Sequence, residues 1–226
     1  MSADVRVGVL ASGRGSNFAA LAAAAANGVL GARITCLVTD NPRAGALAIA
    51  AQYGIPAHVV DAGARRGRVL ATAEAEIIAA LRMHGVQLVC LAGFMRILGP
   101  ELLAAYPDAV LNVHPSLLPA FPGLESQRRA FESGVKLAGC TVHFVDTGVD
   151  TGPIVLQAAV AVRDDDTPET LSARILAEEH RLFPAAVRLW ADGRLDVRER
   201  RVFCRSVPAP AAAAAAHPVT PSGGNS

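Results

Sequence analysis

The sequence lacks an excess of charge of either sign. Its 21 lysines and arginines are matched by 20 aspartates and glutamates, so the formal net charge is +1 and the isoelectric point is about 7.8. Proteins dedicated to nucleic acid or to anionic membranes depend on a basic excess for their affinity. We therefore exclude both partner classes and expect small-molecule ligands.

Long apolar runs and paired cysteines are missing as well. The longest apolar run covers about nine residues at 18–26, whereas a membrane-spanning helix needs roughly 20. The first residues do not resemble a cleavable signal, so we expect a cytoplasmic protein. The four cysteines, Cys36, Cys90, Cys140 and Cys204, lie too far apart in sequence for a disulfide scaffold or a zinc ribbon.

Apolar residues are abundant, at 52% of the chain, and they occur in short β-branched runs that alternate with Ala- and Leu-rich stretches. The pattern predicts strands at 5–10, 33–39, 58–60, 88–91 and 110–113, with helices between them at 17–26, 44–53, 68–83 and 100–106. Strands that are apolar on both faces indicate a buried parallel sheet. Alternation of strands and helices predicts a doubly wound α/β fold.

The pattern changes after Pro115. Helices are predicted at 125–133 and 167–190 and strands at 141–145 and 154–162, which can pair antiparallel at the edge of a mainly parallel sheet. Residues 207–226 have no Asp, Glu, Lys or Arg but contain four prolines and six consecutive alanines. We therefore expect a single domain, 1–206, followed by a disordered tail.

A glycine-rich loop, Ser12-Gly13-Arg14-Gly15-Ser16-Asn17, joins the first predicted strand to the first helix. Its two glycines allow a sharp turn that exposes amide N–H groups at a helix N-terminus, which is a site for an anion. A dinucleotide loop would need glycine at Phe18, and a Walker loop would end in Gly-Lys-Ser/Thr. The alternative is an ordinary turn with a capping Ser or Asn.

A second polar group follows the fifth predicted strand. Asn112 and His114 are two residues apart in that strand, so they project from the same face at its carboxyl end, where open α/β sheets bind ligands. Asp150 lies in the loop between the two edge strands. A carboxylate near His114 would favour the imidazolium and raise its pKa from about 6.5, while Asn112 could donate to an oxyanion.

Each of these residues also has a structural interpretation when taken alone. His114 could be a buried core histidine, Asn112 a strand-end cap and Asp150 a turn residue. Ser116 beside His114 would suit a hydrolase, but the Gly-x-Ser-x-Gly elbow is absent. His143 alternates with Thr141 in a predicted strand, and we interpret it as structural or supporting.

The combination resembles the folate-dependent formyltransferases over about residues 5 to 200. The matching segments are 112–123 (NVHPSLLPAFPG), Asp150 in an Asp-Thr-Gly-Pro context, 12–17 (SGRGSN), 91–98 (LAGFMRIL) and 178–180 (EEH). The resemblance is strongest to members that act on glycinamide ribonucleotide in purine biosynthesis. It implies a Rossmann-like formyltransferase fold and transfer of formyl from 10-formyltetrahydrofolate, as co-substrate, to the primary amine of that ribonucleotide, without a metal.

The resemblance also assigns roles to residues. It implies that Asn112, His114 and Asp150 are catalytic, that Gly15, Ser16 and Asn17 hold the ribonucleotide phosphate, and that Glu179 meets the ribose hydroxyls. For the folate it implies that Met95, Arg96, Ile97 and Leu98 line the pterin pocket with backbone groups. It also implies Asn112 and an arginine among Arg65, Arg66 and Arg68, of which Arg68 is our choice. Gln127 and Ala120 depart from many relatives, which bears on substrate contacts and not on the reaction.

Two rival functions stay open. One is another formyl-group enzyme, either methionyl-tRNA formyltransferase, which has a further C-terminal domain and a basic tRNA surface, or formyltetrahydrofolate hydrolase, which has an N-terminal regulatory domain. The other is a regulator that binds nucleotide or folate without catalysis, against which the intact trio of Asn112, His114 and Asp150 argues.

Overall fold

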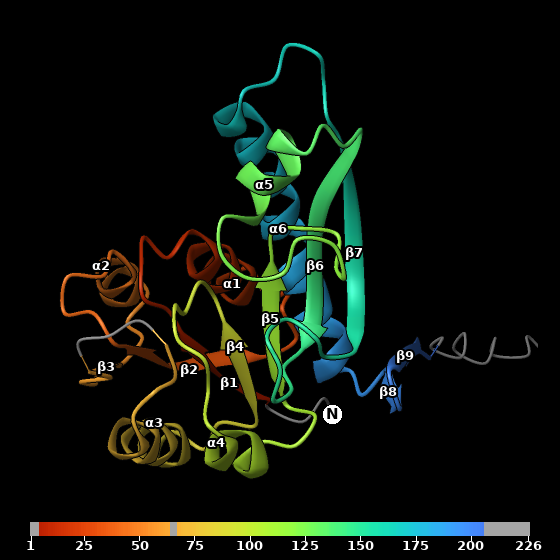
Figure 1. The fold of residues 1–226 in the computed structure, drawn as a ribbon. Coiled ribbons are helices and arrows are strands. Elements are labelled where there is room, and N and C mark those ends of the chain that lie inside the picture. The colour runs from red at the N-terminus through yellow and green to blue at the C-terminus, as the bar shows by residue number, and fades with distance from the viewer. Residues whose placement is uncertain (1–4, 64–66, 206–226) are drawn as a thin grey trace, which may run out of the picture.

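The structure, a computed structural model, describes residues 5–63 and 67–205. Arg65 and Arg66, and the predicted tail at 207–226, lie outside the described residues. The described residues form one continuous sheet with helices on both faces (Figure 1).

The N-terminal half contributes five parallel strands. They are β1 (Arg6–Leu10), β2 (Arg33–Thr39), β3 (Ala57–Val59), β4 (Leu88–Leu91) and β5 (Val110–His114), in the spatial order β3-β2-β1-β4-β5. The chain first builds outward from β1 through β2 and β3 and then returns to the other side of β1 with β4 and β5. The order therefore reverses between β1 and β4, which is where doubly wound sheets open a crevice for a ligand.

Helices cover both faces of these strands because the strand side chains are apolar on both sides. Val7 and Val9 pack with α1 (Ser16–Ala26) and α2 (Ala46–Gln52). Leu10 and Val89 pack on the opposite face with α3 (Ala71–Met83) and α4 (Pro100–Ala105). The parallel, doubly wound prediction is confirmed.

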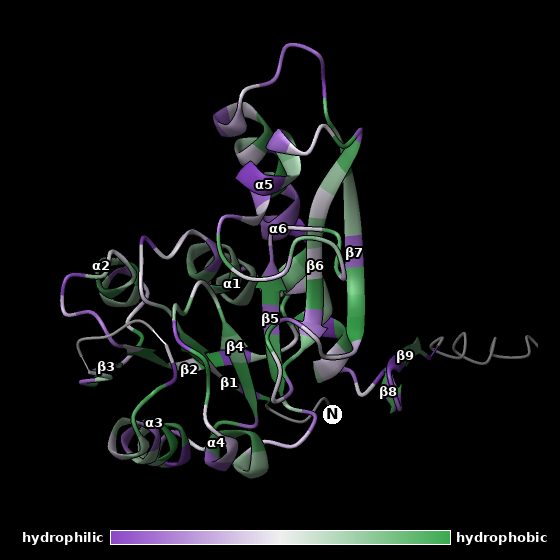
Figure 2. Cartoon of the chain, viewed as in Figure 1, coloured by the Kyte–Doolittle hydropathy of each residue, from purple (hydrophilic) through white to green (hydrophobic). Residues whose placement is uncertain are grey.

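The C-terminal half is antiparallel. After α5 (Ser126–Glu132), the long strands β6 (Leu137–Phe144) and β7 (Ile154–Ala161) form a hairpin whose first strand pairs antiparallel with β5. The 24-residue helix α6 (Pro168–Ala191) packs on this hairpin and on α1. Figure 2 shows that β5 and most of β7 are hydrophobic, whereas α5 is mainly hydrophilic.

Helix α6 begins as the sequence indicates. The Thr167 side chain accepts a hydrogen bond from the Thr170 N–H, Pro168 occupies the first turn, and Glu169 places a negative charge there. All three features favour a helix N-terminus.

Three features differ from the predictions by more than two residues. Helix α3 begins at Ala71 and not at 68, because Arg68 forms a β-bridge with Ile97. Strand β6 begins four residues earlier than predicted, since pairing with β7 outweighs the weak strand propensity of Ala138 and Gly139. The hairpin of β8 (Leu195–Arg198) and β9 (Arg201–Cys204) was not predicted, because its strands are short and rich in arginine.

That hairpin completes the sheet in the order β3-β2-β1-β4-β5-β6-β7-β9-β8. Strand β9 joins β7 through the pair Ile154 and Arg201. None of the helices in the described part of the chain is long and apolar enough to cross a membrane.

Candidate active site

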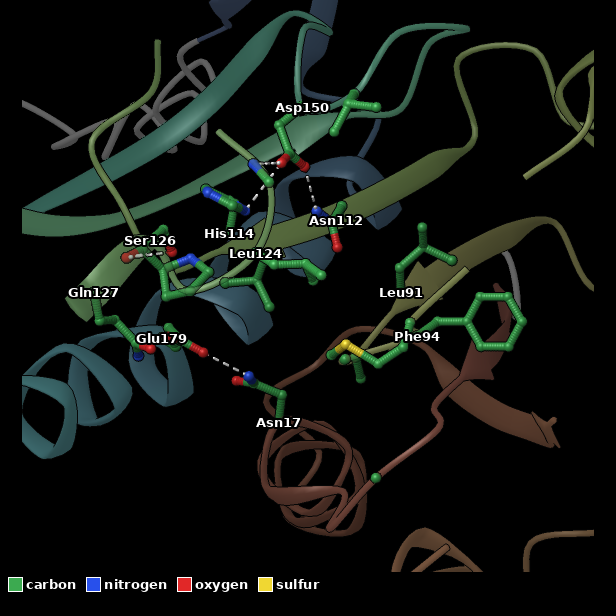
Figure 3. A pocket seen from close by; sticks show the side chains of 18 of the residues that line it. Asn17, Leu91, Phe94, Asn112, His114, Leu124, Ser126, Gln127, Asp150 and Glu179 are labelled. Atoms are coloured by element: carbon green, nitrogen blue, oxygen red, sulfur yellow. Dashed lines mark hydrogen bonds and ion pairs between the residues drawn. The ribbon is translucent and has the colours of Figure 1, made fainter. Parts of the chain in front are cut away.

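A cavity of about 1200 Å³ opens at the carboxyl ends of β1, β4 and β5. Its walls are the loops that follow these strands, the loop between β6 and β7, and one side of α6. Figure 3 shows side chains from these separate segments facing one another across the cavity. The cavity therefore lies at the switch point of the sheet.

The glycine-rich loop forms one end of the cavity. Gly13 through Asn17 all line it, and α1 begins at Ser16 with no acidic residue in its first turn. Gly15 has a φ of 80°, and a Cβ on it would lie 2.9 Å from the Ala46 Cα. Only glycine fits there, so the loop lies close against α2.

Glu179 and Asn17 meet at the same end, although 162 residues separate them. The Asn17 Nδ2 donates to Glu179 Oε2 at 2.7 Å, as Figure 3 shows. Glu179 is only 4% exposed, and burial raises its pKa to about 7 against the opposing hydrogen bond from Asn17. The Asn17 Oδ1 is buried without a hydrogen-bond partner among the described residues. A buried acid and an orphaned amide oxygen are typical of a site that awaits polar ligand groups.

His114 lies at the other end, where both of its ring nitrogens face oxygen. Nδ1 is 3.3 Å from Asp150 Oδ2, and Nε2 is 3.0 Å from the Phe121 carbonyl oxygen. We expected Asp150 to raise the pKa of His114. Burial lowers that pKa below 6.5, and the carboxylate and the carbonyl only partly offset it. Asp150 therefore acts in the expected direction, but the net shift is downward, because burial of His114 outweighs the carboxylate.

Asp150 stays ionised at neutral pH. Burial raises its pKa, but the Gly123 N–H, 2.8 Å from Oδ2, and the His114 ring favour the carboxylate, and the net shift is downward. Asp150 has a φ of 54°, a conformation that few non-glycine residues adopt. Loop contacts and the Gly123 hydrogen bond hold the carboxylate over His114.

Asn112 faces the same carboxylate from β5, with His143 opposite it on β6. The Asn112 Nδ2 is 3.1 Å from His143 Nε2 and 3.5 Å from Asp150 Oδ1. His143 Nδ1 is 2.7 Å from the Phe144 carbonyl, so the proton is best placed on Nδ1 and Nε2 accepts from Asn112. The 3.5 Å contact is at the limit of a hydrogen bond, which leaves one Asn112 N–H available to a ligand.

The segment after β4 lines the middle of the cavity with Met95, Arg96, Ile97 and Leu98. The Arg96 side chain does not face a ligand: its Nε contacts Asp40 Oδ2 at 2.7 Å, and its Nη2 donates to the Gly63 carbonyl. Met95 and Ile97 are 53% and 38% exposed, which offers an apolar surface.

Arg68 is placed beside that segment and not in the cavity wall. Its Nη1 donates to the Leu98 carbonyl at 2.8 Å. The described lining includes its neighbour Gly67 but not Arg68 itself. Gln127, by contrast, does line the cavity.

Ser116, the residue that would suggest a hydrolase, holds the loop after β5. Its Oγ donates to the Ala120 carbonyl at 2.6 Å, while its own carbonyl accepts from the Thr141 hydroxyl at 2.7 Å. These contacts fix the Phe121 carbonyl against His114. Sequence reasoning gave His143 a supporting role but not its contact with Asn112, which depends on the β5–β6 register.

Comparison with known proteins identifies the family of this chain. Residues 5–187 match the formyl transferase family. The chain belongs to the formyl transferase family. A family member of Bacillus subtilis, phosphoribosylglycinamide formyltransferase, is 43% identical over 180 residues, which cover 80% of this chain and 91% of that protein.

Solved structures of formyl transferases share the fold. Glycinamide ribonucleotide transformylase 1 of Symbiobacterium toebii superposes with a TM-score of 0.85 at 49% identity and covers 89% of this chain and 94% of that one. A formyltetrahydrofolate deformylase of Pseudomonas syringae superposes with a TM-score of 0.83 at 27% identity, over 91% of this chain and 67% of that one. The fold alone therefore does not separate transfer to an amine from transfer to water.

Proposed function

We propose that this formyl transferase moves a formyl group from 10-formyltetrahydrofolate to the amine of N1-(5-phospho-D-ribosyl)glycinamide, a step of purine biosynthesis in the cytoplasm. The observation that carries the proposal is one continuous cavity with an anion site at one end and the His114–Asp150 pair at the other. The identity to the Bacillus enzyme over nearly its whole length supports the same substrates.

The two ends fit the two parts of the acceptor. Gly15, Ser16 and Asn17 offer backbone and side-chain donors to a phosphate, and Glu179 lies beside them as an acceptor for ribose hydroxyls. A ribonucleotide held in this way extends its amine toward His114.

The folate fits the middle of the cavity. The exposed surfaces of Met95 and Ile97 would contact the pterin, together with backbone groups of Arg96 and Leu98 and the side chain of Asn112. Arg68 lies just behind the Leu98 carbonyl, so an anionic folate tail that leaves the cavity here would meet its guanidinium.

The chemistry is a proton relay around a tetrahedral oxyanion. The amine nitrogen attacks the formyl carbon, and the carbonyl electrons move to oxygen. His114, whose pKa burial lowers, acts in its neutral form and accepts the proton that the amine must lose. Asp150 stabilises the imidazolium that forms, and the free Asn112 N–H donates to the oxyanion. His114 then returns the proton to the folate nitrogen as the carbon–nitrogen bond breaks.

A formyltetrahydrofolate hydrolase is the rival that the fold permits, since water could replace the amine. The Glu179–Asn17 pair argues against it, because a hydrolase has no ribose to bind. The deciding experiment measures formyl transfer with glycinamide ribonucleotide, formylmethionyl-tRNA formation with charged initiator tRNA, and formate release in water alone. We expect transfer to the ribonucleotide only; formate release at the same rate without an acceptor would overturn the proposal.

A further inference from the structure

The charges that line the cavity are unbalanced. Five carboxylates line it, from Glu125, Asp146, Asp150, Glu169 and Glu179, against two guanidinium groups. Glu179 carries only part of its charge at neutral pH because its pKa is raised to about 7. A phosphate that enters such a cavity meets net repulsion unless a cation lies beside it.

The two arginines in this lining differ in what holds them. Arg96 is 2.7 Å from Asp40 and is largely buried, so its charge is already paired. Arg14 is exposed and makes no hydrogen bond or ion pair with any described residue. Arg14 is therefore the cation of the described lining that is available to a ligand.

The backbone at Arg14 is fixed even though its side chain is free. A Cβ on Gly45 would lie 3.0 Å from the Arg14 carbonyl oxygen, and the Ala46 N–H donates to the Gly13 carbonyl. No atom lies within 4 Å of the position that a Cβ on Gly13 would take, so there is open space beside the loop. The guanidinium thus extends from a rigid loop that also presents Gly15 and Ser16 to the cavity.

We infer that Arg14 binds the phosphate of the acceptor and makes this enzyme select phosphorylated acceptors over unphosphorylated ones. The inference rests on the proposed function, since it assigns one residue's part in binding that substrate. A guanidinium presents two parallel N–H donors to two phosphate oxygens, which a neutral amide loop does not. Without Arg14, only the neutral backbone amides would attract the phosphate, while the carboxylates of the cavity would repel it.

The test compares two acceptors across matched variants. Wild type, Arg14→Gln, Arg14→Lys and Arg43→Gln are each assayed for kcat/KM with glycinamide ribonucleotide and with its dephosphorylated riboside. Arg43 is the matched control: it is an exposed arginine in the next loop, whose Asn41 side chain donates to the Ser12 carbonyl, and it does not line the cavity.

For Arg14→Gln we expect a fall of about 10- to 100-fold in kcat/KM for the ribonucleotide, through KM, and no change for the riboside. Arg14→Lys should recover part of the loss, and Arg43→Gln should stay within about twofold on both acceptors. The KM for the folate should not change in any variant.

Three results would overturn the inference. They are an equal loss on both acceptors, no loss on the ribonucleotide, and an equal loss from Arg43→Gln, which would show a general field effect. Wild-type enzyme that transfers no formyl group to the ribonucleotide would instead refute the proposed function, and this inference with it.

Discussion

The two ends of the cavity are built in different ways. At the anion end, the donors Gly15, Ser16 and Asn17 come from one continuous loop between β1 and α1, and only Glu179 comes from a distant element. The His114 end brings together β5, the loop at 115–123 and the loop between β6 and β7. The conformation of the Gly13–Asn17 loop is determined by its own glycines. The approach of Asp150 to His114 depends instead on the register of the antiparallel β6–β7 hairpin.

Loss of the histidine should have the largest effect. We expect His114→Ala to lower kcat by about 10²- to 10⁴-fold, because His114 carries the proton in the proposed mechanism. The KM for the ribonucleotide should change little, since its phosphate and ribose are held at the other end. Steady-state kinetics measures both constants, and a loss confined to KM would contradict the assignment.

Glu179 should lower the free energy of unfolding at neutral pH while it contributes to ribonucleotide binding. Its carboxyl has a pKa of about 7 when folded against 4.5 in a model peptide, so ionisation costs the folded state about 3 kcal/mol above pH 7. The cost is absent below pH 4.5 and grows between the two values. We expect Glu179→Gln to match wild type in stability at acidic pH, to exceed it by up to about 3 kcal/mol at pH 8, and to raise the KM for the ribonucleotide.

Denaturant unfolding across pH 4 to 8 measures that difference. The Asn17 Nδ2 can still donate to the new amide oxygen, so packing is preserved. A stability gain that is independent of pH would mean that the Glu179 charge is not its cause.

Asp150 should act on the His114 pKa at the other end. Burial lowers that pKa and Asp150 opposes the effect, so Asp150→Asn should lower it further. The neutral imidazole is the resting base, so the acidic limb of the kcat profile should move to lower pH. The plateau should fall by about 10- to 100-fold, because the imidazolium is less stabilised. NMR titration of His114 checks the shift, and an unchanged pKa would exclude electrostatic coupling.

Two glycines in the anion loop should respond differently. Gly15→Ala places a Cβ at 2.9 Å from Ala46 and requires φ near 80°, so we expect a loss of about 1 to 2 kcal/mol in stability. Gly13→Ala meets open space, so it should leave the melting temperature nearly unchanged but raise the KM for the ribonucleotide. Thermal unfolding beside kinetics separates the two effects, and equal melting temperatures would contradict this assignment.

The C-terminal hairpin should affect catalysis weakly. Arg200 Nη2 donates to the Thr151 carbonyl at 3.0 Å, and the Thr151 hydroxyl donates to Asp146 Oδ1 at 2.6 Å, which braces the Asp150 loop. We expect Arg200→Ala to lower kcat by about two- to tenfold without changing the KM for the ribonucleotide, and Arg200→Lys to recover part of it. Arg198→Ala is the control, because that arginine binds Asp196 within the hairpin. Equal effects of both variants would indicate general destabilisation.

The sequence predicted what is encoded locally. The five parallel strands follow from apolar runs, the Gly13–Asn17 loop from its glycines, and the start of α6 from Thr167 and Pro168. The resemblance to a known family, and not periodicity, related Glu179 to the ribose.

Long-range contacts could not be predicted in the same way. The downward pKa shift of His114 depends on how deeply three segments bury it. The ion pair of Arg96 with Asp40 joins residues 56 positions apart, so the sequence did not show what the Arg96 side chain contacts. The hairpin at 195–204 forms because its strand β9 pairs with the free edge of β7. The residues of the hairpin do not by themselves indicate that pairing.

Binding of both substrates in one cavity also determines the kinetic order of the reaction. Its volume of about 1200 Å³ exceeds that of pockets that hold one small ligand, and the proposed mechanism uses no side chain as a covalent carrier of the formyl group. Both substrates must therefore be bound together before the formyl group leaves the folate. Double-reciprocal plots should intersect, and isotope exchange between formylated and free folate should require the acceptor or its product. A molecule that joins a folate group to a ribonucleotide group would occupy both parts of the cavity at once. It would bind more tightly than either part alone, because translational and rotational entropy is lost only once.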